Sequence, residues 1–265
     1  MDHVTSPDGS RIAYVRSGEG SPIVIVGGAL NDHASAAPLV AELGRDLSVI
    51  SYDRRGRGES ASSMPWSLAN EVADLRALAE IAGESIFVYG QSSGAILSVE
   101  AALAELPIKR LVLYEPPYVA DPNDPHAPPA DLADRLRTTL DGPGGADAAV
   151  REFLRLGPGL SADAIEGLST SPTWPRFLSI AFTLPWEAEI VGDGAIPAER
   201  LASFETPTLV LQGSASPAWA QASTAALADA LPHGVLVVLE GLDHGGALAA
   251  PGRVAAEVLR FLSKR

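Results

Sequence analysis

The amino-acid sequence predicts an α/β fold with a mostly parallel sheet of about eight strands and helices on both faces. Three observations lead to this prediction. Short apolar runs recur along the 265-residue chain, segments with helical spacing lie between them, and one long stretch without strand patterns interrupts the alternation. Regular alternation of strand and helix patterns is typical of doubly wound sheets.

Six apolar runs are the predicted inner strands. They are apolar throughout, which is typical of parallel strands that are buried on both faces. Near the N-terminus, Val4 and residues 12–15 flank the turn signal Pro7-Asp8-Gly9 and predict an antiparallel hairpin at the edge of the sheet. The six runs cover residues 23–26, 47–52, 85–89, 111–114, 208–211 and 235–239.

Helical spacing is clearest between Ser67 and Gly83, where apolar residues recur at intervals of three and four. Ser67 can accept hydrogen bonds from first-turn amides, and Gly83 suits the left-handed end of a helix. Residues 93–106 are rich in Ala and Leu and predict a helix that ends before Pro107. Residues 254–262 predict a final amphipathic helix.

Between Glu115 and Pro207 the sequence shows no clear strand pattern. A helical insertion at this point would lie at the carboxyl ends of the strands, where such sheets bind ligands. We expect a helical cap over residues 118–199, inserted before the last two strands, and a core domain made of residues 1–117 and 200–265. The cap is predicted to be a lid, with a helical excursion of no functional role as the alternative. Its helices are expected near residues 131–140, 147–156, 161–168 and 174–190.

The composition argues against several classes of function. A formal net charge of −14 repels phosphate backbones and anionic lipid, so we expect neither nucleic-acid nor membrane partners. The absence of cysteine excludes disulfides, thiolate metal ligands and a thiol nucleophile. The N-terminus lacks a signal-peptide pattern, and no apolar run reaches the roughly 18 residues that span a bilayer. We expect a cytoplasmic protein, either monomeric or homodimeric.

The strongest chemical signal is the G-x-S-x-G motif Gly90-Gln91-Ser92-Ser93-Gly94. It follows a predicted strand directly and opens a predicted helix directly, which is the context of a nucleophile elbow. The glycines allow a sharp turn that presents Ser92, and the helix N-terminus favours an anionic intermediate. A Gly- and Ser-rich turn without chemistry is the alternative.

A serine nucleophile needs a base, and His244 is the candidate among five histidines. It lies five residues after the last predicted strand, and small neighbouring residues would let it approach Ser92. We expect His3 in the N-terminal hairpin, His126 in a Pro-rich stretch and His233 in an exposed turn.

An oxyanion hole needs two backbone N–H donors aimed at developing negative charge. One is expected from Ser93, the residue after the nucleophile, and the other from the glycine loop that follows the first inner strand. In that loop, Gly27-Gly28-Ala29-Leu30, we expect the amide of Ala29 to be the donor, with the amide of Leu30 as the alternative.

Together these features resemble the α/β-hydrolase superfamily, in its serine-nucleophile branch, over nearly the whole chain. The order of the strands, the elbow at Ser92, the late His244 and the helical cap carry the resemblance. Residues 53–60, DRRGRGES, resemble the DxRGxGxS segment common in these enzymes, and we expect them to fix a loop beside the elbow. The resemblance implies the α/β-hydrolase fold and no cofactor or metal. It does not identify the substrate, because this fold carries many chemistries.

The third member of the triad departs from the family pattern. An Asp usually follows the strand after the cap, but Ser216 stands in that place. Glu115 ends the strand after the elbow and is the expected replacement, an acid placement that resembles the zearalenone-type lactonases. Pro116 and Pro117 would fix the direction in which the chain leaves this strand. The alternatives are a Ser–His pair steered by Ser216 or water, orientation by Asp243, and a Glu115 that is merely exposed.

The expected function is hydrolysis of a carboxylic ester or lactone of an apolar small molecule, through an acyl-enzyme formed on Ser92. A carbon–carbon bond hydrolase or a cofactor-free perhydrolase is the first alternative. A non-catalytic ligand-binding protein of the same fold, suggested by the missing Asp, is the second. The side chains expected to line the substrate pocket, or else to pack within the cap or lie exposed, are Leu30, His33, Tyr118, Phe182 and Trp186.

Overall fold

The computed structural model describes residues 1–61, 64–83, 85–121, 124 and 127–264. Eight strands form one sheet in the order β1-β2-β4-β3-β5-β6-β7-β8. The β1–β2 and β2–β4 pairs are antiparallel and the other pairs are parallel, so the predicted mostly parallel sheet with an N-terminal hairpin is confirmed. The strands are β1 (Asp2–Thr5), β2 (Arg11–Ser17), β3 (Ser21–Val26), β4 (Leu47–Tyr52), β5 (Ile86–Gln91), β6 (Ile108–Tyr114), β7 (Thr208–Gly213) and β8 (Gly234–Leu239).

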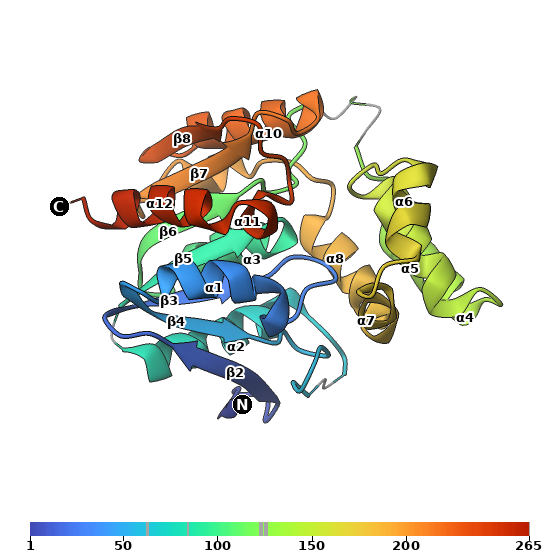
Figure 1. The fold of residues 1–265 in the computed structure, drawn as a ribbon, viewed down its shortest axis with the longest axis horizontal. Helices are drawn as coiled ribbons and strands as arrows, with labels where there is room; N and C mark the ends of the chain where they lie inside the picture. Colours follow the sequence, from blue (N-terminus) through green and yellow to red (C-terminus); the bar gives the residue numbers. More distant parts are fainter. Residues whose placement is uncertain (62–63, 84, 122–123, 125–126, 265) are drawn as a thin grey trace.

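Helices cover both faces of the sheet, as the apolar character of five of the six predicted inner strands indicates. The prediction is wrong for the sixth, β8, which lies at the edge of the sheet with Val235, Leu236 and Val238 exposed. Residues of α2 (Leu68–Ala82), α3 (Ser93–Leu103) and α10 (Ala218–Ala230) pack in the apolar core on one face. Figure 1 shows α1 and α12 on the opposite face. This second layer consists of η1 (His33–Ala36), α1 (Ala37–Leu43), α11 (Gly246–Ala249) and α12 (Pro251–Leu262), and its apolar residues form a second core cluster.

The stretch between β6 and β7 is helical, as predicted. Most of its helices stand to one side of the sheet, at the right of Figure 1, and α8 lies between them and the sheet. An isolated bridge between Val119 and Ala195 joins its two ends. The division into a core and a cap at residues 118–199 remains a prediction. The inserted helices are α4 (Leu132–Asp141), α5 (Gly145–Leu156), α6 (Ala162–Ser169), α7 (Trp174–Ser179), η2 (Ala181–Thr183), α8 (Leu184–Val191) and α9 (Ala198–Leu201).

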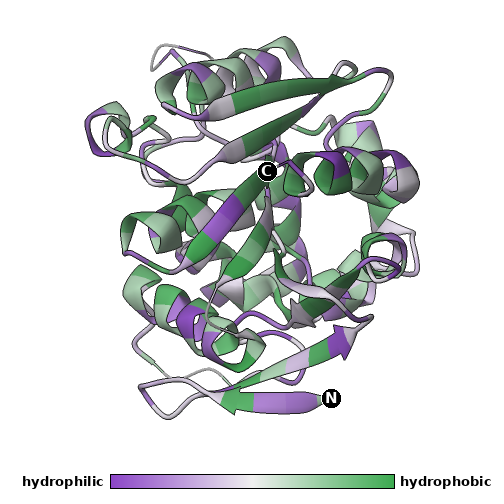
Figure 2. Cartoon of the chain, turned by 90° about the vertical axis from the view of Figure 1, so that its left-hand side faces the viewer, coloured by the Kyte–Doolittle hydropathy of each residue, from purple (hydrophilic) through white to green (hydrophobic). Residues whose placement is uncertain are grey.

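Hydropathy follows this architecture. Figure 2 shows apolar residues along the inner strands and polar residues in the strand beside the N-terminus. Ile23 to Val26 of β3 are almost fully buried, and so are Leu111 to Tyr114 of β6. Within the described part of the chain, no helix is both long and apolar enough to cross a bilayer.

Candidate active site

Ser92 lies between β5 and α3 with a φ of +54°, the strained conformation that a nucleophile elbow requires. The glycines on both sides are needed for close packing. A Cβ at Gly90 would lie 2.7 Å from the Cα of Ala95, and one at Gly94 would lie 2.4 Å from the carbonyl oxygen of Val26. The chain can therefore make this turn only because neither position carries a side chain.

The loop after β3 lies directly against the nucleophile. A Cβ at Gly28 would lie 2.8 Å from the Cβ of Ser92 and 3.4 Å from its Oγ. In the part of the chain that the structure describes, no hydrogen bond engages the backbone N–H of Ala29 or of Ser93. The amides of Ala29 and Ser93, which the sequence predicts as oxyanion donors, therefore have no hydrogen-bond partner among the described residues, and their role stays a prediction.

Glu115 and His244 are in contact although 129 residues separate them in the chain. The imidazole Nδ1 lies 2.9 Å from Oε2 of Glu115. A carboxylate can only accept, so this contact places a proton on Nδ1 and leaves Nε2 available as a base. Glu115 is buried, with 3% of its surface exposed, so the alternative of a merely exposed glutamate is wrong.

The second carboxylate oxygen of Glu115 is held from β7 and the turn after it. Oε1 accepts hydrogen bonds from the backbone N–H of Gly213 at 2.7 Å and from Ser216 Oγ at 2.6 Å. Burial alone would raise the pKa of Glu115, but the hydrogen bonds from His244 and Ser216 hold that pKa below its ordinary value. Glu115 is therefore ionised at neutral pH.

The backbone of Glu115 adopts a strained conformation. Its φ is +43°, a left-handed conformation that is uncommon for a residue with a side chain, and Pro116 follows it directly. The backbone N–H of Glu115 donates to the carbonyl oxygen of Leu211 at 3.1 Å. The end of β6 is thus tied to β7 and turns the carboxylate toward the loop that carries His244.

The loop that carries His244 is anchored to the elbow and to β6. The side-chain amide of Gln91, next to Ser92, donates to the carbonyl oxygen of His244 at 3.3 Å. Tyr114 donates from its hydroxyl to the carbonyl oxygen of Asp243 at 2.6 Å. Among the described residues, no hydrogen bond joins Ser92 Oγ to the imidazole. Catalytic hydrogen bonds of this kind often tighten only when substrate is bound.

Asp243 does not orient the imidazole, because its carboxylate caps the amide of Gly245 at 2.9 Å. Two other histidines lie where the sequence places them. His3 is in β1 and exposed, and His233 is exposed beside Glu205 at 3.5 Å. His126 lies outside the described residues.

The segment of residues 53–60 forms the predicted loop beside the elbow, and its arginines are buried in ion pairs. Arg54 makes two hydrogen bonds to Glu71, and Arg55 makes two to Asp74. Arg54 and Arg57 also reach Glu187 on α8. Sequence reasoning missed Glu187, because nothing in its local pattern distinguishes it from an exposed helical glutamate.

Two of the expected pocket residues pack between layers. Leu30 is 4% exposed and lies in the apolar cluster of the inserted helices. Trp186 stacks on Trp66, with ring centroids 5.8 Å apart and planes 7° apart. A Cβ on Gly56 would lie 2.8 Å from the Trp186 ring, so this ring also covers the loop of residues 53–60.

The other three candidates differ in exposure. Phe182 is 46% exposed and meets Trp186 edge-on, with ring centroids 5.5 Å apart. Tyr118 is buried in the core cluster that also contains Ile190 and Leu201. His33 is partly exposed, and its Nδ1 lies 2.8 Å from the buried carboxylate of Asp53.

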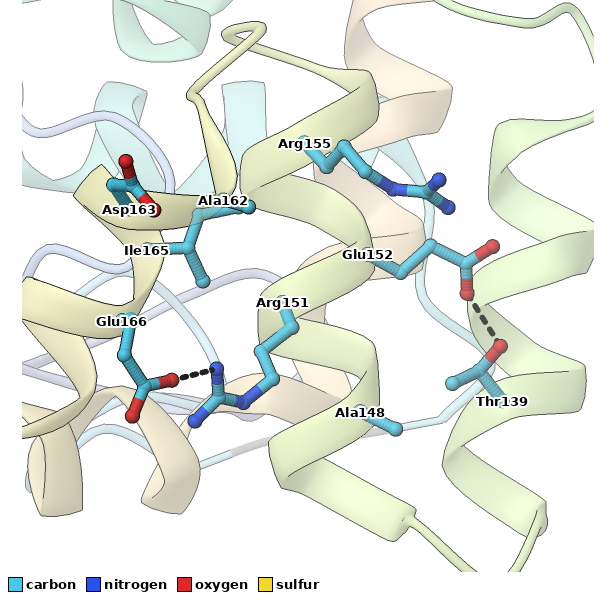
Figure 3. Close-up of a pocket in the computed structure, with 9 residues that line it drawn as sticks. All are labelled: Thr139, Ala148, Arg151, Glu152, Arg155, Ala162, Asp163, Ile165 and Glu166. Atoms are coloured by element: carbon cyan, nitrogen blue, oxygen red, sulfur yellow. Dashed lines mark hydrogen bonds and ion pairs between the residues drawn. The ribbon is translucent and has the colours of Figure 1, made fainter.

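A shallow hollow of about 650 Å³ lies on the inserted helices and contains none of the candidate catalytic residues. Figure 3 shows charged side chains of α5 and α6 around it, with Arg151 paired to Glu166. Exposed ion pairs of this kind are ordinary surface features, so we assign the hollow no role in the site. Across the described ranges, no group of three or more His, Cys, Asp or Glu residues is arranged to hold a metal ion.

A family model described as the alpha/beta hydrolase family matches residues 23–257. The crystal structure of an alpha/beta hydrolase from Sphaerobacter thermophilus DSM 20745 is 42% identical, with a TM-score of 0.93, and the match covers 99% of this chain and 100% of that chain.

Two more distant structures share the fold. An esterase from Rhodococcus sp. ECU1013 is 20% identical with a TM-score of 0.76, over 99% of this chain and 98% of that chain. A meta-cleavage product hydrolase from Pseudomonas fluorescens IP01 is 18% identical with a TM-score of 0.69, over 99% and 97% of the two chains. At these identities the likeness concerns the fold alone.

Proposed function

The chain belongs to the alpha/beta hydrolase family, and on that premise we propose that it is a serine hydrolase that cleaves a carboxylic ester or lactone of an apolar substrate. The observation that carries the proposal is the contact of 2.9 Å between His244 Nδ1 and the buried carboxylate of Glu115. It supports Glu115 as the orienting acid in place of the Asp of the family pattern, where this chain has Ser216. With the elbow at Ser92, it supports a complete Ser–His–Glu set.

The proposed reaction is a two-step acyl transfer. His244 takes the proton of Ser92 as the hydroxyl attacks the ester carbonyl, and the amides of Ala29 and Ser93 hold the oxyanion. The imidazolium protonates the leaving alcohol, and the neutral imidazole then activates a water molecule that releases the acid. Glu115 stays ionised throughout, keeps the proton on Nδ1 and stabilises the imidazolium.

The same contact bears on the alternatives. The serine at position 216 favoured a non-catalytic ligand-binding role, because the usual acid is missing there. The contact of the Glu115 carboxylate with the imidazole argues against that reason. A carbon–carbon bond hydrolase or a perhydrolase would use the same nucleophile and base. We keep hydrolysis of an ester or lactone as the proposal and include diketones in its test.

The test is a substrate panel of aryl esters, alkyl esters, macrolactones and diketones, followed before the steady state with substrate in excess over enzyme. The proposal predicts a burst equal to one per chain before steady turnover, seen as alcohol release from at least one ester or as ring opening of at least one lactone. A folded protein that turns over only diketones, or none of the panel, would contradict it.

A further inference from the structure

Glu187 is a fully buried carboxylate on α8 that faces the core of the protein. Arg54 donates to it from Nη1 at 3.1 Å, and Arg57 donates to it from Nη2. Burial alone would raise the pKa of Glu187, but the positive charges of the two arginines hold that pKa below its ordinary value. An inserted helix therefore places a permanent negative charge beneath the loop of residues 53–60.

The two arginines hold the backbone of the glycine loop. Arg57 Nη1 donates to the carbonyl oxygen of Gly28 at 2.7 Å and to that of Asn31 at 3.0 Å. Arg54 Nη1 donates to the carbonyl oxygen of Gly27 at 3.3 Å. Two carbonyl groups of the loop and that of Asn31 directly after it thus accept hydrogen bonds from arginines that are paired with Glu187.

Fixing the Gly28 carbonyl also fixes the amide that follows it. The peptide group is planar and trans, so the C=O of Gly28 and the N–H of Ala29 point in opposite directions. Because Arg57 binds the carbonyl, the Ala29 N–H is turned away from Arg57. This amide is the first proposed oxyanion donor.

Glu187 also touches the second proposed donor. The hydroxyl of Ser93 donates to its carboxylate directly. Ser93 is the first residue of α3, and its backbone N–H stands beside Ser92. One carboxylate therefore links both halves of the proposed oxyanion hole, through Arg57 on one side and through Ser93 on the other.

We propose that Glu187 is a positioning residue that sets the two oxyanion-hole amides, so that α8 is a working part of the active site and not only part of a cover. This inference rests on the proposed serine hydrolase function. It predicts that loss of the Glu187 charge weakens transition-state stabilisation more than substrate binding.

A variant that removes one charge of each sign can separate an effect on catalysis from an effect on stability. Arg54, Arg57, Glu71 and Glu187 form a cluster with two positive and two negative charges. Glu187→Gln leaves an unpaired buried cation and is expected to lower the melting temperature. The double variant Arg57→Met/Glu187→Met removes one charge of each sign and leaves Arg54 paired with Glu71, so it is expected to lose less stability than Glu187→Gln, although the carbonyl groups of Gly28 and Asn31 lose their donor.

The experiment measures kcat, KM and the affinity for phenylboronic acid, whose tetrahedral adduct on a serine carries an oxygen in the oxyanion hole. Both Glu187 variants should lose about 10²- to 10³-fold in kcat, with KM changed by less than about threefold, because the donors act mainly in the transition state. The affinity for phenylboronic acid should fall in both variants, again without a matching change in KM.

Two control variants show whether the loss is specific. Asp74→Asn breaks the neighbouring buried pair with Arg55, and Glu189→Gln breaks the exposed pair with Arg137 on the same helix as Glu187. Neither pair reaches the glycine loop, so kcat per folded molecule should stay native in both. A similar loss of kcat in Asp74→Asn would overturn the proposal, as would native kcat in the double variant.

Failure to obtain either Glu187 variant as a folded protein would also overturn the proposal, because the network would then serve the fold and not the amides. A failure of the underlying function is recognised separately. In that case the native protein itself would show neither turnover of the ester panel nor an adduct of phenylboronic acid on Ser92.

Discussion

Ser216 Oγ donates a hydrogen bond of 2.6 Å to Oε1 of Glu115. The residue that occupies the usual place of the triad acid therefore touches the acid that replaces it. The two positions lie at the ends of neighbouring strands, β6 and β7, which are paired from Leu111 to Tyr114. We expect a carboxylate from either strand end to reach the same imidazole, and here Glu115, at the end of the strand after the elbow, contacts it.

This adjacency leads to a relocation experiment. Glu115→Ala should lower kcat by about 10³- to 10⁴-fold, because the imidazole loses its orienting carboxylate. Adding Ser216→Asp returns a carboxylate from the neighbouring strand and should recover at least about tenfold of that loss. Steady-state kinetics on the best ester of the panel measures both values. No recovery, with the fold intact, would show that the strand ends are not interchangeable.

The pH dependence of stability provides a second prediction. The pKa of Glu115 is depressed in the folded protein, so its contribution is fully present above the unfolded pKa of about 4.3 and is lost as pH falls through the lower folded value. The gap in melting temperature between the native protein and Glu115→Gln should be constant near neutral pH and shrink below about pH 4. Thermal unfolding between pH 3 and 8 measures the gap. A gap that stays constant to the lowest pH would argue against a depressed pKa.

The elbow glycines give a prediction about folding. Gly94→Ala would place a Cβ 2.4 Å from the carbonyl oxygen of Val26 and 2.6 Å from that of Gly27, so it should destabilise the protein by about 1–3 kcal/mol or more. Gly167→Ala on α6 is the matched control, because nothing lies within 4 Å of its Cβ. It should stabilise the protein by about 0.5–1 kcal/mol. Chemical denaturation measures both, and equal effects would contradict the packing argument.

Variants of Phe182 and Trp186 should distinguish a side chain that contacts the substrate from one that only packs within the fold. Trp186→Ala removes a buried ring stacked on Trp66 and should cost about 3–5 kcal/mol of stability. Phe182 is half exposed, so Phe182→Ala should change stability by less than about 1 kcal/mol. We expect the Phe182 variant to raise KM for bulky apolar esters more than for acetate esters. Unchanged KM values across the ester series would remove Phe182 from the substrate pocket.

Much of the core could be predicted from the sequence because its signals are local. Continuous apolar runs locate the inner strands, and Gly90 and Gly94 flank a serine at a strand-to-helix junction. The helices that were not identified include α1 and α10. The α1 helix is short and follows a 3₁₀ turn, and α10 is rich in alanine with little difference between its faces. Their positions depend on packing against the sheet more than on local pattern.

The buried contacts of Glu187 with Arg54, Arg57 and Ser93 could not be predicted from the sequence, because these partners are far apart in the chain. Arg57 and Glu187 are 130 residues apart, and Ser93 and Glu187 are 94 apart. A glutamate on a short helix is normally read as exposed, and only the docking of α8 against the elbow buries it. The Glu115–His244 contact, in contrast, was expected from the place of Glu115 at the end of the strand after the elbow.

Labelling with a fluorophosphonate probe tests the central claim most directly, because the probe reacts with serines that a neighbouring base activates. We predict one adduct per chain, located on Ser92 by peptide mass spectrometry. Ser92→Ala should give no adduct with its melting temperature retained, and Glu115→Gln should label more slowly than the native protein. A folded native protein that takes no label, or takes it at another residue, would contradict the Ser92–His244–Glu115 assignment.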